Sequence, residues 1–177
     1  MGLGCYLQET SLTQQSIAMK ITERALQIAI ARYYDTRKHI VVPNVSHAFF
    51  NHECDVLVLT ASGYATEIEI KISAADLRKD FTKRKHQIKR PDQISRLFYC
   101  VPEKLLDLAM QIIPEQYGII TFRLYEPLYA GGPERLLLKQ QRQAEKRLNS
   151  KPWSDKDKVA LLRNFHIKSW DYIYGKQ

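Results

Sequence analysis

Two carboxylates and an ammonium alternate with isoleucines at residues 67–72, which read EIEIKI. In an extended strand successive side chains point to opposite faces, so Glu67, Glu69 and Lys71 share one face and the isoleucines share the other. The simplest interpretation is a hydrated charged face on a strand whose isoleucines pack on a helix. Carboxylates beside an ammonium are also the groups that bind a divalent ion and act on a phosphate, which makes a metal site the competing interpretation.

The strand that precedes this one brings a third carboxylate, Asp55, to the same face. If Gly63 takes the left-handed position of a three-residue loop, Asp55 lies opposite Glu69 in the hairpin. A two-residue turn would instead pair Asp55 with Ile70 and send the carboxylates to opposite faces. Facing carboxylates repel each other unless a cation lies between them, which predicts a hard divalent ion with oxygen ligands. Lys71, one pleat beyond Glu69, could hold a water on that ion or stabilise charge developing on a phosphate.

The elements that must position these residues alternate between helical and extended patterns. Apolar residues three and four positions apart from Ile17 onward predict a first helix, and Ser73 is a suitable N-cap for a second. Runs rich in β-branched and aromatic residues predict strands, and Pro43 in the first run suggests a sheet edge or a bend. In chain order we expect a helix from residue 17 to about 32, strands at 39–50, 54–60 and 64–72, a helix at 74–89, a strand at 97–101, a helix at 103–113 and a strand at 118–124. This αβββαβ order, continued by a helix and a strand, predicts an α/β fold with a mixed sheet flanked by helices.

The charge of the chain is unevenly distributed. The sequence has 27 Lys and Arg against 19 Asp and Glu, a net charge of +8, which favours an anionic partner and nucleic acid over a membrane surface. After the Gly-Gly-Pro at residues 131–133 the composition changes, with eleven basic and five acidic residues from position 131 to the end. We therefore expect one domain at residues 1–130 and a basic helical appendage at residues 131–177, with two amphipathic helices separated at Pro152, the first through Leu136–Leu138. The appendage could pack on the domain or serve as a nucleic-acid-binding arm, and the two roles are compatible.

Other kinds of chemistry lack the residues that they need. The three cysteines have no Cys-x-x-Cys spacing, so neither a zinc site nor a disulfide framework is expected, and Cys54 and Cys100 are expected in the core. The histidines show no ligand spacing, and His52, although close to Asp55 in the sequence, is interpreted as having no part in the chemistry. Neither a phosphate-binding glycine loop nor a Gly-x-Ser-x-Gly motif is present. No apolar run has the length of a membrane span and no signal-peptide pattern opens the chain, so no membrane partner and a cytoplasmic location are expected.

The chain has Asp55 on one strand of the hairpin, Glu69-Ile70-Lys71 at the end of the next, and an αβββαβ order of elements. This pattern resembles that of the PD-(D/E)XK nuclease superfamily. Within it the sequence is similar to the MmcB-like DNA-repair-associated proteins, through this strand, the Ser-Ala-Ala-Asp-Leu at residues 73–77 and the Phe-Tyr-Cys-Val-Pro at residues 98–102. The archaeal Holliday-junction resolvases share the same pattern more loosely. The resemblance covers roughly residues 17–124 and implies a restriction-endonuclease-like core.

The resemblance implies roles for individual residues. Asp55 and Glu69 would bind Mg²⁺ or Mn²⁺, with the backbone carbonyl of Ile70 as a further ligand, and Lys71 would orient or activate the attacking water. Glu23 is the candidate for the acidic residue that many members add from the first helix. The residue before Asp55 is Cys54 where the superfamily motif has proline, a position at which the superfamily is permissive. The second helix is strongly basic, and this charge by itself predicts contact with the DNA backbone through Lys83, Arg84, Lys85, Gln87 and Lys89. The resemblance adds that Gln87 or Lys85 would contact the scissile phosphate.

We therefore expect a Mg²⁺-dependent nuclease that hydrolyses DNA phosphodiester bonds in repair, recombination or phage DNA metabolism. A homodimer would suit the cutting of two strands. One alternative is a non-catalytic nucleic-acid-binding adaptor with the same fold. Another is a structural role, in which Lys83, Arg84 or Lys89 pairs with Glu67 and Glu69. In the nuclease interpretation Asp55 and Glu69 need a cation, so Mg²⁺ is expected to raise the melting temperature of the protein.

Overall fold

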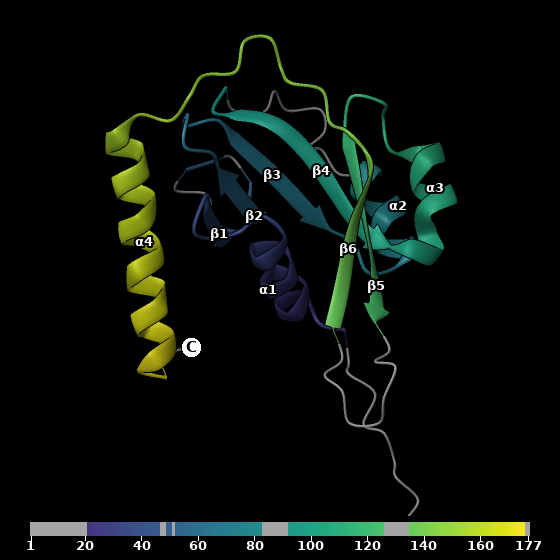
Figure 1. The fold of residues 1–177 in the computed structure, drawn as a ribbon, viewed down its shortest axis with the longest axis horizontal. Helices are drawn as coiled ribbons and strands as arrows, with labels where there is room; N and C mark the ends of the chain where they lie inside the picture. Colours follow the sequence, from purple (N-terminus) through teal and green to yellow (C-terminus); the bar gives the residue numbers. More distant parts are fainter. Residues whose placement is uncertain (1–20, 47–48, 51, 83–91, 126–134, 176–177) are drawn as a thin grey trace, which may run out of the picture.

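A computed structural model describes residues 21–46, 49–50, 52–82, 92–125 and 135–175. Its centre is a six-stranded sheet in which the strands lie side by side in chain order (Figure 1). Neighbouring strands are antiparallel except for β3–β4 and β4–β5, which are parallel. The strands are β1 Ile40–Val45, β2 Cys54–Leu59, β3 Ala65–Ile70, β4 Ile94–Pro102, β5 Gly118–Tyr125 and β6 Arg135–Arg142. The prediction of an α/β fold with a mixed sheet and flanking helices is confirmed, and Pro43 lies in an edge strand, β1.

Helix α1, Glu23–Tyr33, covers one face of the sheet. Its buried Leu26 and Ile30 pack in one cluster with the even-numbered residues of β2 and β3, among them Val56 and Ile68. The helix was predicted from residue 17, but residues 17–20 lie outside the described part of the chain. It begins at Glu23, because Thr22 has an extended backbone and its hydroxyl accepts a hydrogen bond from the N–H of Ala25 at 3.2 Å. An N-cap of this kind satisfies an amide that has no partner inside the helix, which fixes the start of the helix.

Helices α2, Ala74–Thr82, and α3, Leu106–Ile112, cover the opposite face of the sheet. A 3₁₀ turn at Glu103–Leu105 leads into α3, in agreement with the predicted helix at 103–113. Leu77 of α2 and Ala109 of α3 are buried against residues of β4 and β5. The second helix was expected to continue to residue 89, but residues 83–91 lie outside the described part of the chain.

The segment after residue 130 corrects the predicted domain division. Leu136–Leu138 belong to β6 and not to a helix, because β6 pairs with β5 along its length and completes the sheet. Leu136 and Leu138 pack on the α1 side of the core, whereas Leu137 is 39% exposed, which is the alternation of a strand. A boundary at residue 130 would remove an edge strand from the sheet, so residues 131–177 are not a separate helical appendage.

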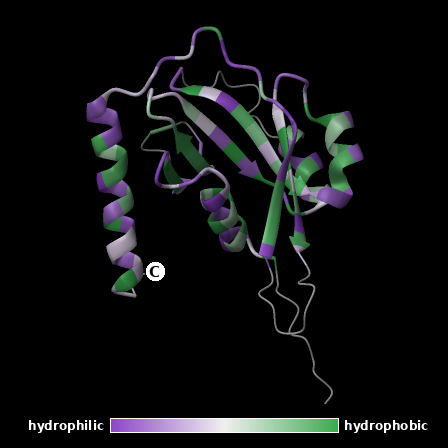
Figure 2. Ribbon diagram, in the orientation of Figure 1, coloured by the Kyte–Doolittle hydropathy of each residue, from purple (hydrophilic) through white to green (hydrophobic). Residues whose placement is uncertain are grey.

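The rest of the C-terminal segment is anchored by one tryptophan. The Trp153 indole is 4% exposed, donates its Nε1 hydrogen to the carbonyl of Gln93 at 3.1 Å and lies between Phe49 and Phe50. Helix α4, Asp155–Ile173, then runs beside the β1 edge of the sheet and presents both hydrophilic and hydrophobic residues (Figures 1 and 2). Leu161 is its buried residue, and the aromatic residues nearer its end are exposed: Trp170, Tyr172 and Tyr174. Among these four aromatic residues of the segment, Trp153 is therefore the buried one.

Cys54 and Cys100 are buried free thiols, as predicted. Among the described residues, no helix has the length and apolar character needed to cross a membrane.

Candidate functional site

The loop between β2 and β3 sets which residues of the hairpin face each other. Gly63 has a positive φ of 82°, its N–H bonds the carbonyl of Thr60 at 2.9 Å, and the N–H of Thr60 bonds the carbonyl of Tyr64 at 3.0 Å. This is a three-residue loop with glycine in the left-handed position. The register pairs Val56 with Ile68, so the next position, Asp55, comes opposite Glu69. The pairing predicted from the sequence is confirmed.

The charged face of β3 is buried, so its interpretation as a hydrated strand face is wrong. Glu67 is 0%, Glu69 2% and Lys71 5% exposed. Two further polar residues, Asp80 of α2 and His52 before β2, reach this face and contact its charged side chains. Charged groups are rarely buried this far unless they are paired or bind a metal ion.

The Lys71 ammonium is at the centre of this cluster. Its Nζ lies 2.8 Å from Glu69 Oε2, 3.6 Å from Asp80 Oδ1 and 3.9 Å from Asp55 Oδ2. Burial alone would lower the pKa of Lys71, but the charges of these carboxylates outweigh burial and raise the pKa above its usual value. Lys71 is therefore a cation at neutral pH, suited to hold an anion and unable to accept a proton.

Asp55 is held at the start of β2 by the backbone of the neighbouring strand. Its Oδ2 accepts the N–H of Ile70 at 2.7 Å. Burial and then the charge of Glu69 raise the pKa of Asp55 to about 6, although the Ile70 N–H and Lys71 act in the opposite direction. The ionised form of Asp55 is thus costly in the folded protein without a further cation. Ile70 contacts Asp55 through its N–H, and the role of its carbonyl as a metal ligand stays a prediction.

Asp80 is a member of the cluster that sequence reasoning missed. It is fully buried on α2, and its Oδ2 accepts the hydroxyl hydrogen of Tyr99 at 3.0 Å, while its Oδ1 faces Lys71. Tyr99 lies beside Glu69 on the neighbouring strand β4, so the tyrosine connects the helix to the charged strand. An aspartate within a basic helical segment gave no signal in the sequence, because only the packing of α2 turns it towards the sheet.

His52 is a second residue that was missed. Its Nε2 lies 2.6 Å from Glu67 Oε1, and its ring stacks on Phe50 with centroids 5.8 Å apart. His52, Glu67 and Glu69 each offer a ligand atom, and these three atoms lie within 4.8 Å of one another. Its proximity to Asp55 in the sequence was the available signal. The structure places His52 against the charged face, and the interpretation that it has no part in the chemistry stays a prediction.

Glu23 is not brought into the cluster. It is exposed in the first turn of α1, and its Oε1 accepts a hydrogen bond from Gln27 at 3.0 Å. Gln27 also reaches Asn44 and the backbone carbonyl of Asp55, so Glu23 is linked to the site through one intervening side chain, and its charge is among the influences that raise the pKa of Asp55. The predicted DNA-contacting residues lie outside the described part of the chain: Lys83, Arg84, Lys85, Gln87 and Lys89.

The donor set fits the divalent ion that the sequence predicted. Asp55 and Glu69 supply carboxylate oxygens from facing strands, and Glu67 and His52 supply an oxygen and a nitrogen beside them. Carboxylate oxygens suit Mg²⁺ and Mn²⁺. Burial and the charge of Glu69 raise the pKa of Asp55 to about 6, so a cation beside this carboxylate would favour its ionised form.

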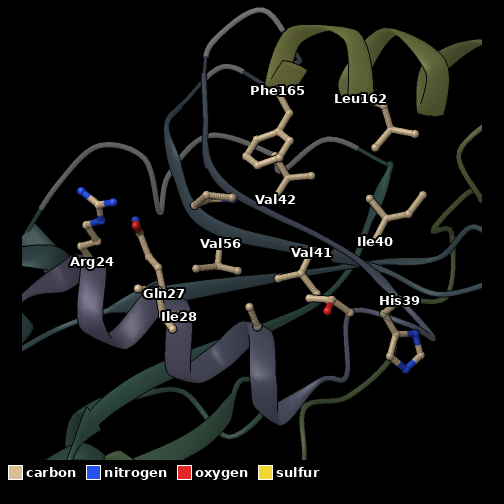
Figure 3. Close-up of a pocket in the computed structure, with 13 residues that line it drawn as sticks. Arg24, Gln27, Ile28, His39, Ile40, Val41, Val42, Val56, Leu162 and Phe165 are labelled. Atoms are coloured by element: carbon tan, nitrogen blue, oxygen red, sulfur yellow. The ribbon is translucent and has the colours of Figure 1, made fainter. Parts of the chain in front are cut away.

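A separate groove lies on the α1 side of the sheet. Its volume is about 590 Å³, and Ile28, Val41, Leu162 and Phe165 line it between α1, β1 and α4 (Figure 3). The lining includes neither the carboxylates nor Lys71, and is mainly apolar. The groove is therefore distinct from the charged cluster.

No known family model matches the chain, and no curated protein matches it. Its fold is similar to that of a protein of unknown function from Silicibacter pomeroyi, with a TM-score of 0.55 and 17% identity over 88% of this chain and 91% of the other. At this identity the similarity concerns the fold alone. Fold and site together define an α/β protein with a mixed sheet and a buried cluster of acidic residues around one lysine.

Proposed function

We propose that the protein is a metal-dependent nuclease of the PD-(D/E)XK type that hydrolyses DNA phosphodiester bonds. The observation that carries the proposal is the convergence of three side chains: the carboxylates of Asp55 on β2 and Glu69 on β3 lie within 3.9 Å of the ammonium of Lys71, the residue that follows β3. Such a buried arrangement of charges is costly for stability, and residues held at that cost are characteristic of functional sites.

In this proposal Asp55 and Glu69 hold Mg²⁺ or Mn²⁺. A divalent ion there supplies positive charge to the scissile phosphate and lowers the pKa of a coordinated water. Lys71 stabilises negative charge on the phosphate, because its raised pKa keeps it protonated. The net charge of +8 supports a polyanionic substrate, and contact with the phosphate backbone would make binding weaken with salt.

A second candidate is a nucleic-acid-binding adaptor whose cluster serves only stability. It is favoured by the ion pair between Lys71 and Glu69, in which one carboxylate oxygen of Glu69 lies 2.8 Å from the ammonium. In that case Lys71, Glu69 and Asp80 would form a structural network, and DNA would bind elsewhere on the surface.

Cleavage assays distinguish the two candidates. Wild type, Glu69→Gln and Lys71→Met are incubated with supercoiled, linear, single-stranded and branched DNA, with Mg²⁺ or Mn²⁺. The exposed carboxylate of Glu103, which faces Arg123 at 3.8 Å, gives the matched control Glu103→Gln. The nuclease proposal expects cleavage by wild type and by the control, and loss of at least about a hundredfold in both site variants. DNA binding without cleavage by folded wild type would overturn the proposal in favour of the adaptor.

A further inference from the structure

The site contains a nitrogen donor that the Asp55–Glu69 pair does not require. His52 Nε2 is directed at the charged face of β3, where it lies 2.6 Å from Glu67 Oε1. The histidine side chain is 15% exposed, and the side chains of Glu67 and Glu69 are 0% and 2% exposed. One donor atom from each of the three residues fits within 4.8 Å, a spacing that a single ion can span.

The ring of His52 is also held in place. It stacks on the buried Phe50 at an interplanar angle of 23°, and its Nε2 is directed at Glu67, leaving the ring little freedom to turn away. Fixed orientation of an imidazole is what a metal ligand needs, since a mobile ring loses conformational entropy on binding.

The chemistry of this donor set differs from that of carboxylates alone. Mg²⁺ is a hard ion that prefers oxygen ligands and keeps several waters, whereas first-row transition ions accept imidazole nitrogen readily. Two carboxylates and one imidazole therefore favour a transition ion. Glu69 belongs both to this set and to the pair with Asp55, so the two sets of ligands adjoin within one site.

We propose that His52, Glu67 and Glu69 bind a divalent first-row transition ion, for which Mn²⁺ is the probe, in preference to Mg²⁺. The inference rests on the proposed function, which supplies the metal site, and adds the preference of that site for a transition ion over Mg²⁺. Its alternative is a purely structural hydrogen bond between His52 and Glu67, with no metal contact by the imidazole.

The test is a comparison of metal affinities without DNA. Mn²⁺ binding is followed by the electron paramagnetic resonance signal of the unbound ion, and Mg²⁺ binding by its competition with Mn²⁺. His52→Gln retains a donor for the hydrogen bond to Glu67 but loses the imidazole nitrogen. We expect His52→Gln to weaken Mn²⁺ binding about 10- to 100-fold and Mg²⁺ binding less than about threefold, so that the preference for Mn²⁺ collapses. The exposed His166 of α4 gives the control His166→Gln, which should bind both ions as wild type does.

A second measurement keeps the inference open to refutation if His52→Gln folds poorly. In wild type, Mn²⁺ well below one equivalent should broaden the imidazole resonances of His52 and leave those of His166 sharp. Unchanged Mn²⁺ affinity in a folded His52→Gln protein, or a sharp His52 resonance with Mn²⁺ bound, would overturn the inference.

Failure of this inference can be told apart from failure of the proposed function. A wild-type protein that binds Mn²⁺ through His52 but cleaves no DNA would overturn only the nuclease proposal. A nuclease whose metal preference is the same in His52→Gln would overturn only the role of His52.

Discussion

Replacement of Asp55 by asparagine should stabilise the metal-free protein at neutral pH. The raised pKa of Asp55 means that folding penalises its ionised form, through burial first and the charge of Glu69 second. Asparagine removes the charge and keeps an oxygen that can accept the N–H of Ile70, now bonded at 2.7 Å. Stabilisation by the loss of an acidic side chain would indicate that this residue is retained for a purpose other than folding.

The size of the expected stabilisation follows from the shift in the pKa of Asp55. A rise from 3.8 to about 6 corresponds to roughly 3 kcal/mol of folding free energy, because each pKa unit is about 1.4 kcal/mol. The side chain is 24% exposed, so solvent screening reduces the expected gain to about 2 kcal/mol. For a chain of this length such a gain raises the melting temperature by about 4–8 °C.

The stability difference between Asp55→Asn and wild type should depend on pH. The folded-state pKa lies above the unfolded value, so below pH 3.8 Asp55 is protonated in both states and carries no penalty. As the pH rises from 3.8 through about 6, Asp55 must ionise in the folded protein, so the free energy of unfolding of wild type falls while that of Asp55→Asn does not fall for this reason. The advantage of Asp55→Asn should therefore be largest near pH 7.5 and close to zero near pH 4.

The assay is thermal and urea unfolding in EDTA at both pH values. Asp107→Asn, an exposed position in the first turn of α3, is the control and should show no gain. Mg²⁺ or Mn²⁺ at pH 7.5 should raise the melting temperature of wild type and have less effect on Asp55→Asn. An Asp55→Asn protein that is less stable than wild type at pH 7.5, or one whose gain is equal at both pH values, would show that folding does not penalise ionised Asp55.

Three further substitutions test the packing around the site, each by urea unfolding. Lys71→Met removes the ammonium that lies 2.8 Å from Glu69 and 3.6 Å from Asp80 and leaves buried carboxylates near one another, so a loss of about 3–5 kcal/mol is expected. Gly63→Ala places a Cβ at a φ of 82° and 3.1 Å from the carbonyl oxygen of Trp153, which should cost about 1–3 kcal/mol. Trp153→Ala empties a site where the indole is 4% exposed and should cost about 3–5 kcal/mol, whereas Trp153→Phe should cost less.

A Lys71→Met protein within about 1 kcal/mol of wild type would mean that the carboxylates of the cluster do not need the lysine. If Gly63→Ala were as stable as wild type, the left-handed loop would not be required for the hairpin register. Equal stabilities of Trp153→Ala and wild type would show that the segment before α4 is not anchored through its indole.

The hairpin shows how much of the site is local. Ala61, Ser62 and Gly63 define a short loop, and short loops leave few conformations, so the register that places Asp55 opposite Glu69 could be predicted from the sequence. The alternation of residues in β3 likewise predicted that Glu69 and Lys71 share a face. These relations depend on backbone geometry over a few residues, which the sequence controls directly.

Other features depended on partners far away in the chain. Three consecutive leucines, Leu136–Leu138, are compatible with a helix or a strand, and pairing with β5 decides for the strand. Whether the charged face of β3 is hydrated could not be read from β3 itself, because α2 and the segment before β2 cover it.

Local patterns in the sequence predicted the order of the first elements and the shared face of Glu69 and Lys71, and they limited the hairpin to two registers, one of which adds Asp55 to that face. Tertiary packing buries Glu69 and Lys71, leaves Asp55 half-buried, brings Asp80 and His52 to the group, and leaves Glu23 outside it. These features differ in how far apart in the sequence the interacting residues lie. Register and alternation are set by backbone geometry between neighbouring residues, whereas burial depends on which distant elements pack against a face.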